Sequence, residues 1–306
     1  MTAGSVPAVP AAVADWAARG RTLSLPGGDV WVLDQPATEE GGLEPVLILH
    51  GFPTCSFDWR HVLPGLSRRR RVVLFDFPGF GLSAKPDQRY SIRGQADVAE
   101  AVCDAVGLDR FALLTHDMGD SIGGEMLARD IDGDLDVEIT RRVLSNGSIY
   151  LELAHLTPGQ LFLLGLPDAR LEPRPAGAPP DDGEAMRAAL AATFSPDSPP
   201  NPGELEAQWA LIARGDGQLL LPRTIRYIED RRAEEARFTG AIERHPSPLT
   251  VVWGEQDPIA VVAMVDRLRG RRIDADVTVL DGVGHYPMIE DPARFASATV
   301  AALDTP

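Results

Sequence analysis

The sequence predicts an α/β fold, in which a mostly parallel eight-stranded sheet is flanked by helices and carries a helical cap after its sixth strand. Short apolar runs alternate with helical stretches along most of the chain, as is typical of parallel α/β sheets. The alternation stops over residues 148–246, which contain helical patterns and no convincing strand. We therefore expect core residues 1–147, a cap over residues 148–246 and core residues 247–306.

Eight apolar runs are the expected strands. The first two flank the turn signal Pro26-Gly27-Gly28 and predict an antiparallel hairpin. The later runs are apolar throughout, which is typical of strands covered on both faces. In chain order the runs are Thr22–Leu25, Asp29–Asp34, Pro45–His50, Val72–Phe75, Phe111–Thr115, Arg142–Ser145, Leu249–Trp253 and Asp276–Leu280.

Helical patterns fill most of the gaps between these runs. In the core they cover Phe57–Arg69, Ser91–Val106, Asp120–Asp130, Ile259–Arg269 and Pro292–Leu303. In the cap they cover Leu156–Leu166, Gly183–Thr193, Glu204–Arg214 and Leu219–Glu235. Because ligands of open α/β sheets bind at the carboxyl ends of the strands, we expect this cap to shape a pocket there.

Composition restricts the classes of protein that this chain can represent. A chain of 306 residues with 44% hydrophobic residues is ordinary for a soluble globular protein. No apolar run approaches the roughly 18–20 residues that span a bilayer. Residues 1–20 lack a basic stretch ahead of an apolar core, so we expect a flexible start and no secretory signal. Cys55 and Cys103 make no disulfide framework, and we expect reduced thiols and a cytoplasmic location.

Two nucleophile patterns overlap between Phe111 and Gly123. The esterase pattern G-x-S-x-G is met by Gly119-Asp-Ser121-Ile-Gly123, and a small-x-Asp-x-Gly pattern by Thr115-His-Asp117-Met-Gly119. A nucleophile elbow must follow its strand at once, because the reactive side chain sits on the turn itself. The apolar run ends at residue 114 or 115, so we place Asp117 on the turn and Ser121 in the helix that follows. A plain helix N-cap is the alternative role for Asp117.

An acid and a histidine follow two later strands in the order that this architecture requires. Asp257 comes after the run 249–253, and His285 after the run 276–280. The turn His50-Gly-Phe-Pro53 follows the third strand and is a candidate oxyanion hole, with the N–H groups of Phe52 and Met118 as donors. His50 and His116 lie beside this site, where we expect them to be oriented structural groups.

Together these residues resemble the α/β-hydrolase superfamily, and within it the branch with an aspartate nucleophile, the epoxide hydrolases and haloalkane or haloacid dehalogenases. Besides the residues above, the resemblance rests on Asp76-Phe-Pro-Gly-Phe-Gly-Leu-Ser-Ala-Lys-Pro86 and Gly254-Glu-Gln-Asp257-Pro. The chain also resembles the mesoderm-specific transcript (MEST)-like hydrolases. That similarity is carried by His116-Asp117-Met-Gly-Asp120, Leu144-Ser-Asn-Gly147, Gly215-Asp-Gly217, Arg226-Tyr-Ile-Glu229, His285-Tyr-Pro287 and Glu290-Asp-Pro292.

The resemblance also implies groups that bind the substrate or the leaving group. Many members carry a tryptophan after the nucleophile, which holds the halide in dehalogenases; Met118 stands there and disfavours a haloalkane. Epoxide hydrolases use two cap tyrosines. Tyr227 has the spacing of one, whereas the region of the other holds Phe162. Tyr150 is either its substitute or a packing residue. His50 and His116 complete the candidate binding set.

The resemblance implies a hydrolase with an Asp117–His285–Asp257 triad that acts through an alkyl-enzyme ester and is most similar to epoxide hydrolases. It implies no metal or organic cofactor. The alternatives are a dehalogenase of a small haloalkane or haloacid, a serine esterase using Ser121, and a non-catalytic ligand-binding protein. The partners expected are a small hydrophobic substrate and water, and a homodimer is left open. The formal charge of −16 argues against nucleic acid, and we expect no membrane insertion.

Overall fold

A single eight-stranded sheet forms the centre of the molecule in the computed structural model, which describes residues 9–175 and 181–305. Its strand order is β1-β2-β4-β3-β5-β6-β7-β8. The β1–β2 and β2–β4 pairs are antiparallel and the others are parallel. The strands are β1 Arg21–Leu25, β2 Gly28–Gln35, β3 Leu43–Leu49, β4 Arg70–Phe75, β5 Arg110–His116, β6 Glu138–Ser145, β7 Leu249–Gly254 and β8 Asp276–Leu280.

Each strand overlaps the apolar run that predicts it, and β6 departs most from its prediction. It begins at Glu138 instead of Arg142. Only the last four residues of β6 are all buried, whereas the first four include the exposed Glu138 and two partly buried residues. The apolar run therefore marks only the buried end of this strand, while pairing with β5 extends the rest.

Helix α1 (Ala11–Ala17) corrects the expected flexible start for residues 11–17. Val13 and Trp16 are one helical turn apart and both are buried. The Trp16 ring lies 5.7 Å from Trp31 and 6.1 Å from Phe57, between centroids. The burial of these two apolar side chains holds the alanine-rich segment on the core. Residues 1–8 lie outside the described residues.

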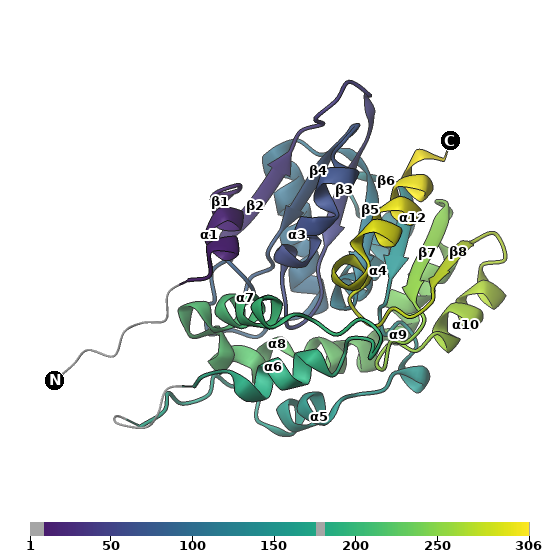
Figure 1. The fold of residues 1–306 in the computed structure, drawn as a ribbon. Helices are drawn as coiled ribbons and strands as arrows, with labels where there is room; N and C mark the ends of the chain where they lie inside the picture. Colours follow the sequence, from purple (N-terminus) through teal and green to yellow (C-terminus); the bar gives the residue numbers. More distant parts are fainter. Residues whose placement is uncertain (1–8, 176–180, 306) are drawn as a thin grey trace.

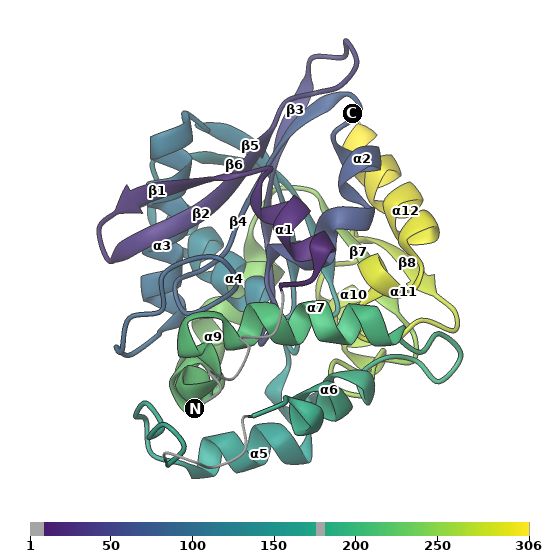
Figure 2. The ribbon, with the colours of Figure 1, turned by 60° about the vertical axis from the view of Figure 1, so that its left-hand side comes forward.

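Helices cover both faces of the sheet, with α1, α2 and α12 on one side and α3 and α4 on the other (Figure 2). The helix predicted over Phe57–Arg69 is instead the 3₁₀ helix η1 followed by the four-residue α2. Pro64 stands in the first turn of α2, where its missing N–H costs no hydrogen bond. The bounds are η1 Ser56–His61, α2 Leu63–Leu66, α3 Ile92–Val106, α4 Met118–Asp132, α10 Ala263–Arg271, α11 Pro287–Glu290 and α12 Pro292–Asp304.

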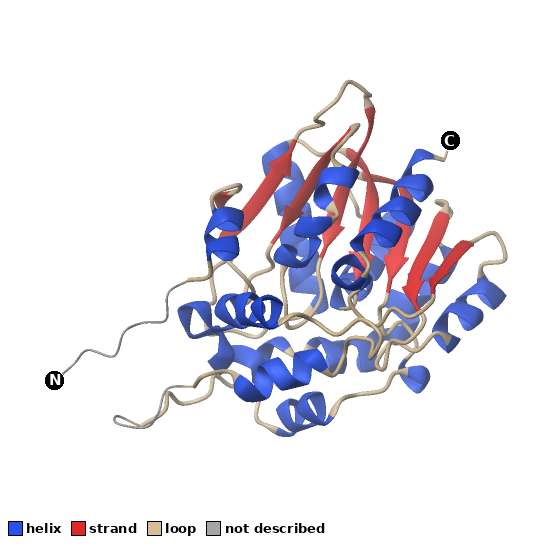
Figure 3. Cartoon of the chain, in the orientation of Figure 1, coloured by secondary structure: helices blue, strands red, loops and turns tan. Residues whose placement is uncertain are grey.

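The insertion between β6 and β7 is helical and covers the carboxyl ends of the parallel strands (Figures 1 and 3). Its last helix, α9, returns to the core and packs on α4 so closely that a Cβ on Gly124 would lie 2.7 Å from the Phe238 carbonyl oxygen. The cap consists of η2 Leu151–Leu153, α5 Pro158–Gly165, α6 Glu184–Ala191, α7 Pro202–Ala213, η3 Arg214–Leu220, α8 Leu221–Thr224 and α9 Tyr227–Arg244. The predicted fold class, including the helical insertion after the sixth strand, is confirmed.

Hydrophobic side chains on both faces of the sheet form one continuous core. Val32, Val46, Leu47 and Val251 are among the strand residues with no exposed surface. Among the helices of the described residues, none is both long enough and apolar enough to cross a bilayer. The sheet and its helices thus form a base, and the cap stands on the edge where the strand ends meet (Figure 1).

Candidate active site

The turn between β5 and α4 presents Asp117 at the carboxyl edge of the sheet. β5 ends at His116 and α4 begins at Met118, so Asp117 is the single residue between them. Its backbone angles are φ 51° and ψ −113°, a region that side-chain-bearing residues rarely adopt. The start of α4 passes so close to β3 that a Cβ on Gly119 would lie 2.5 Å from the Leu49 carbonyl oxygen. Asp117 therefore has the strained strand–turn–helix geometry of a nucleophile elbow.

Ser121 lies inside α4, one turn beyond Asp117. The Arg231 Nε of helix α9 donates a hydrogen bond of 2.8 Å to the Ser121 Oγ. Both side chains are buried. The contact directs this hydroxyl toward the α4–α9 interface. Neither Ser121 nor Asp117 is among the residues that line the cap cavity, and Phe52, which bonds Asp117, is.

The loop after β3 meets the elbow through a main-chain hydrogen bond. The Phe52 N–H donates to the Asp117 Oδ2 at 2.8 Å. A Cβ on Gly51 would lie 2.6 Å from the Asp117 Cβ, so only glycine permits this approach. One oxygen of the Asp117 carboxylate thus occupies the place of an oxyanion-hole ligand. Met118 is the first residue of α4, where N–H groups lack partners within the helix, and its role as second donor stays a prediction.

Asp257 and His285 come together from the loops after β7 and β8. The His285 Nδ1 and the Asp257 Oδ2 are 2.7 Å apart. The other Asp257 oxygen, Oδ1, accepts hydrogen bonds from the N–H groups of Ile259 (2.7 Å) and Ala260 (2.9 Å). The carboxylate is therefore fixed at both oxygens, and it orients the imidazole with Nε2 free for proton transfer.

Asn146 is a site residue whose role the sequence does not predict, although it stands in the Leu144–Gly147 motif. It follows β6 with φ 47°, and its Nδ2 donates to the Asp257 Oδ2 at 2.8 Å. Its Oδ1 accepts the Gly254 N–H at 2.9 Å. Asn146 therefore ties the end of β6 to the loop that carries Asp257. Its position after a strand and before Gly147 is the signal that could have identified it.

Burial and neighbouring charges set the protonation of the histidines. Burial alone would lower the pKa of His285, but the charges of Asp257 and Asp117 outweigh it and raise this pKa to about 9. Burial and the nearby His285 lower the pKa of His116 to about 4. His285 is therefore protonated at neutral pH, and His116 is neutral.

His50 and His116 bind main-chain groups. The His50 Nε2 accepts the Phe77 N–H at 3.0 Å, and its Nδ1 lies 2.8 Å from the Gly51 carbonyl oxygen. The His116 Nε2 lies 2.8 Å from the His285 carbonyl oxygen. Neither histidine lines the cap cavity. These contacts hold the oxyanion loop and the His285 loop in place, and the assignment of both histidines to the binding set stays a prediction.

The two candidate cap tyrosines occupy different environments. Tyr227 is buried, and its ring centroid lies 5.7 Å from that of Phe52. Burial, and then the Asp117 charge, raise the pKa of the Tyr227 phenol, so it stays protonated. The Tyr150 hydroxyl instead donates to Glu243 at 2.9 Å, and its ring lies beneath Arg267. The structure thus places Tyr227 next to the elbow and turns Tyr150 toward α9 and α10.

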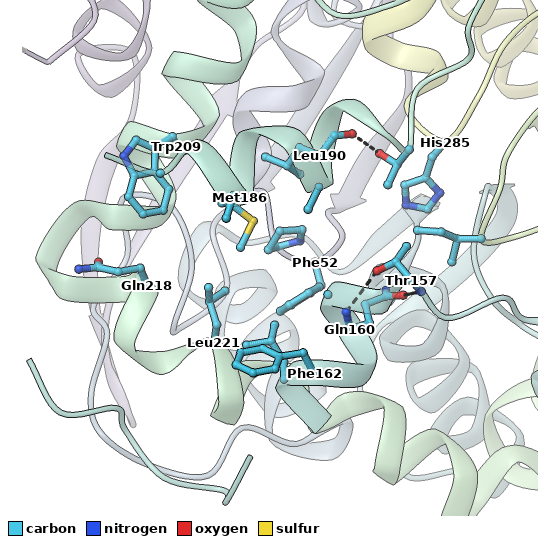
Figure 4. A pocket seen from close by; sticks show the side chains of 18 of the residues that line it. Phe52, Thr157, Gln160, Phe162, Met186, Leu190, Trp209, Gln218, Leu221 and His285 are labelled. Carbon is cyan, nitrogen blue, oxygen red and sulfur yellow. Dashed lines mark hydrogen bonds between the residues drawn. The ribbon is translucent and has the colours of Figure 1, made fainter. Parts of the chain in front are cut away.

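A cavity of about 320 Å³ separates the cap from the core. Phe52, His285 and Tyr286 line it from the core, and cap side chains including Phe162, Met186 and Trp209 close it from the other side. Figure 4 shows His285 and Trp209 at opposite sides of the lining. Phe162 is 67% exposed, so it forms part of the rim. The lining is largely apolar, which suits an uncharged hydrophobic ligand.

Within residues 9–175 and 181–305, no group of three or more His, Cys, Asp or Glu side chains has the arrangement to hold a metal ion. The groups that converge on the site are a carboxylate held by a main-chain N–H, an acid–histidine pair and a buried phenol. This arrangement is suited to nucleophilic attack followed by base-assisted hydrolysis.

Comparison with known proteins adds relatives along nearly the whole chain. A family described as "Alpha/beta hydrolase family" matches residues 46–298. LipZ, a protein of Mycobacterium tuberculosis named as a hydrolase, is 40% identical over 295 residues, which cover 95% of this chain and 98% of LipZ. The human mesoderm-specific transcript homolog protein is 32% identical over 308 residues, covering 98% of this chain and 90% of that protein. An α/β-hydrolase-fold protein from Burkholderia ambifaria has a TM-score of 0.72 at 23% identity, covering 92% and 97% of the two chains.

Proposed function

This chain belongs to the alpha/beta hydrolase family, and we propose that it is a cofactor-independent hydrolase that uses Asp117 as its nucleophile, with an epoxide as substrate. The observation that carries the proposal is the elbow. Asp117 alone occupies the strained turn between β5 and α4, and its Oδ2 accepts the Phe52 N–H. A serine at the elbow would favour ester hydrolysis, but Ser121 lies in the helix and is bonded to Arg231.

In the first step, an Asp117 carboxylate oxygen attacks a ring carbon of the epoxide, and the carbon–oxygen bond of the ring breaks. The Phe52 N–H holds Oδ2, which leaves Oδ1 as the attacking oxygen. The departing alkoxide needs a proton, and Tyr227 is a protonated phenol close to the elbow. The products of this step are an alkyl ester on Asp117 and a free hydroxyl group on the former epoxide.

In the second step, water cleaves the ester. Forming the ester removes the negative charge of Asp117, which is one of the charges that raise the pKa of His285. His285 therefore loses its proton more readily in the intermediate than in the free enzyme, and that proton restores the Tyr227 phenol, which gave its own proton to the alkoxide. It can then take a proton from water, which attacks the ester carbonyl carbon while Phe52 and Met118 N–H groups stabilise the oxyanion. As the tetrahedral intermediate collapses, the proton of its new hydroxyl group passes to the departing alkoxide, so Asp117 is restored as a carboxylate and a diol leaves.

The phenol of Tyr227 supports an epoxide over a halide as the substrate. A halide ion leaves without a proton, whereas a ring-opened epoxide leaves an alkoxide that must be protonated. A buried proton donor beside the nucleophile thus supports the epoxide. A haloalkane or haloacid is the second candidate, supported by the same Asp117, and Met118 stands where those dehalogenases carry the halide-binding tryptophan.

A single turnover in ¹⁸O-labelled water tests the nucleophile. With styrene oxide and excess enzyme, one ¹⁸O should enter the Asp117 carboxylate. The first diol released should contain no ¹⁸O, because one of its oxygens comes from the epoxide and the other from Asp117. Mass spectrometry of the peptide that contains residue 117 reads this directly. Label that appears in the first product and never in Asp117 would contradict a covalent mechanism. A haloalkane and a nitrophenyl ester, tested in parallel, identify the competing substrate classes.

A further inference from the structure

The Glu290 carboxylate binds three main-chain N–H groups around the His285 loop. Its Oε2 accepts the N–H groups of Gly284 at 2.7 Å and of Ser195 at 2.9 Å. Its Oε1 accepts the Tyr286 N–H at 2.9 Å. Gly284 and Tyr286 are the residues on either side of His285, whereas Ser195 belongs to the cap. One side chain at the end of α11 therefore joins both flanks of the histidine to the cap.

The main chain of His285 itself is held from two further directions. Its N–H donates to the Thr193 carbonyl oxygen of the cap at 3.1 Å. Its carbonyl oxygen lies 2.8 Å from the His116 Nε2. A Cβ on Gly284 would lie 2.4 Å from the Ser195 N, so the cap segment approaches the loop without space for a side chain. The position of the imidazole thus depends on contacts that include the cap.

The cap segment 193–198, between α6 and α7, also contacts the loop that carries Asp257. The Ser195 Oγ donates to the Gln256 Oε1 at 2.7 Å, and the Gln256 Nε2 donates to the Asp197 Oδ2 at 2.9 Å. The Ser198 Oγ donates to the Glu290 carbonyl oxygen at 3.0 Å. This segment therefore forms hydrogen bonds beside both Asp257 and His285.

We propose that Glu290 is a positioning residue for His285, and that it acts by fastening the residues on both sides of the histidine to cap segment 193–198. Glu290 touches neither the cavity nor Asp117 in the structure, so its positioning effect passes through the main chain of the His285 loop, beside the direct effect of its charge on the imidazole. The kinetic consequence rests on the proposed function, because it requires His285 to be the base. The geometric consequence, a correctly placed imidazole, does not depend on which residue is the nucleophile.

Two substitutions separate the shape of this side chain from its charge. Glu290→Gln keeps the length but replaces one acceptor oxygen with an NH₂ group, which cannot accept the N–H bonds. Glu290→Asp keeps the charge but shortens the reach. Because displacing a catalytic group by about 1 Å costs about 100-fold in rate, we expect both to lower kcat by about tenfold to 100-fold with little change in KM. Ser198→Ala is the matched control, since it removes a contact with the main chain of Glu290 and leaves the carboxylate intact.

A titration of His285 by NMR provides a readout that a merely structural residue would not change. The Glu290 charge contributes to the raised pKa of His285, after the larger effects of Asp257 and Asp117. Glu290→Gln should therefore lower that pKa below the wild-type value of about 9, and Glu290→Asp should largely preserve it. The His285 signal is assigned with a His285→Gln variant, and thermal unfolding verifies that each variant is folded.

Folded Glu290→Gln protein with wild-type kcat and an unchanged His285 titration would overturn the proposal. Wild-type protein that turns over no substrate, combined with a shifted His285 titration in Glu290→Gln, would contradict the proposed function and leave the contact between Glu290 and the His285 loop standing. Equal losses of kcat in Glu290→Gln and Ser198→Ala would show that the Ser198 contact matters as much as the Glu290 carboxylate. That result also overturns the proposal.

Discussion

The Phe52 N–H and the Asp117 Oδ2 are 2.8 Å apart, and this hydrogen bond joins the loop after β3 to the turn after β5. The bond exists because Gly51 brings no side chain to the contact. It leaves one carboxylate oxygen of Asp117 held and the other available. A substitution at Gly51 can therefore disturb the carboxylate without changing Asp117 itself.

Gly51→Ala should abolish most activity in a protein that still folds. Its Cβ would lie 2.6 Å from the Asp117 Cβ and 2.9 Å from Oδ2, so the carboxylate or the loop must shift. A displacement of about 1 Å corresponds to about 100-fold in kcat/KM. Gly65→Ala is the control, because its Cβ would meet only the Ala296 Cβ at an ordinary 3.6 Å. Steady-state kinetics measure both variants, and an equal loss of kcat/KM in the two would contradict the prediction.

Asp117→Ala should eliminate turnover, whereas Ser121→Ala should retain it. Removing the Ser121 hydroxyl leaves the Arg231 Nε without its acceptor, which costs about 1–3 kcal/mol of unfolding free energy. We therefore expect Ser121→Ala to be less stable and still active. Denaturant unfolding and single-turnover kinetics measure the two effects separately. The reverse pattern of activity would support the serine esterase.

Tyr227→Phe should slow ring opening of an epoxide by about 100-fold to 10,000-fold, the usual contribution of a general acid. Tyr150→Phe is the matched control, since its hydroxyl is bonded to Glu243 and its loss should leave kcat unchanged. Rapid-quench measurement of ester formation isolates the step. Equal rates for wild type and Tyr227→Phe would remove this phenol from the mechanism.

The His285 titration should respond to the charge of Asp117. The folded-state pKa of about 9 lies above the ordinary value of 6.5. Asp117→Ala removes one charge that raises this pKa, so the NMR titration midpoint should fall. By linkage, the stability gained from protonated His285 is complete below pH 6.5 and is lost as the pH rises through about 9. Unfolding free energies of wild type and His285→Gln should therefore converge across this window, and a constant difference would contradict the shift.

Trp16→Ala should destabilise the protein by about 3–5 kcal/mol, the usual effect of truncating a buried aromatic side chain. Trp16 holds α1 against Trp31 and Phe57. Val9→Ala, at a position that is 62% exposed, is the control and should change stability little. Urea unfolding measures both. Equal stability of Trp16→Ala and wild type would mean that α1 does not contribute to the core.

Much of the fold could be predicted because apolar runs report burial directly. All eight strands follow from such runs, and the strand end at β5 separates Asp117 from Ser121. The start of β6 could not be predicted, since its polar first half is held by pairing with β5. Helix α1 was missed because an Ala- and Pro-rich terminus gives a weak pattern, and its helix depends on contacts with Trp31 and Phe57.

By itself, the sequence determined the fold class, the position of the cap and the order of Asp117, Asp257 and His285 after the fifth, seventh and eighth strands. These follow from local periodicity and spacing, which each segment carries alone. Only the tertiary structure decided that Asn146 bonds Asp257, that Tyr150 turns away to Glu243, and that Glu290 joins the His285 loop to the cap. Such contacts depend on side-chain directions and on distances between segments far apart in the chain, and no local pattern of residues encodes them.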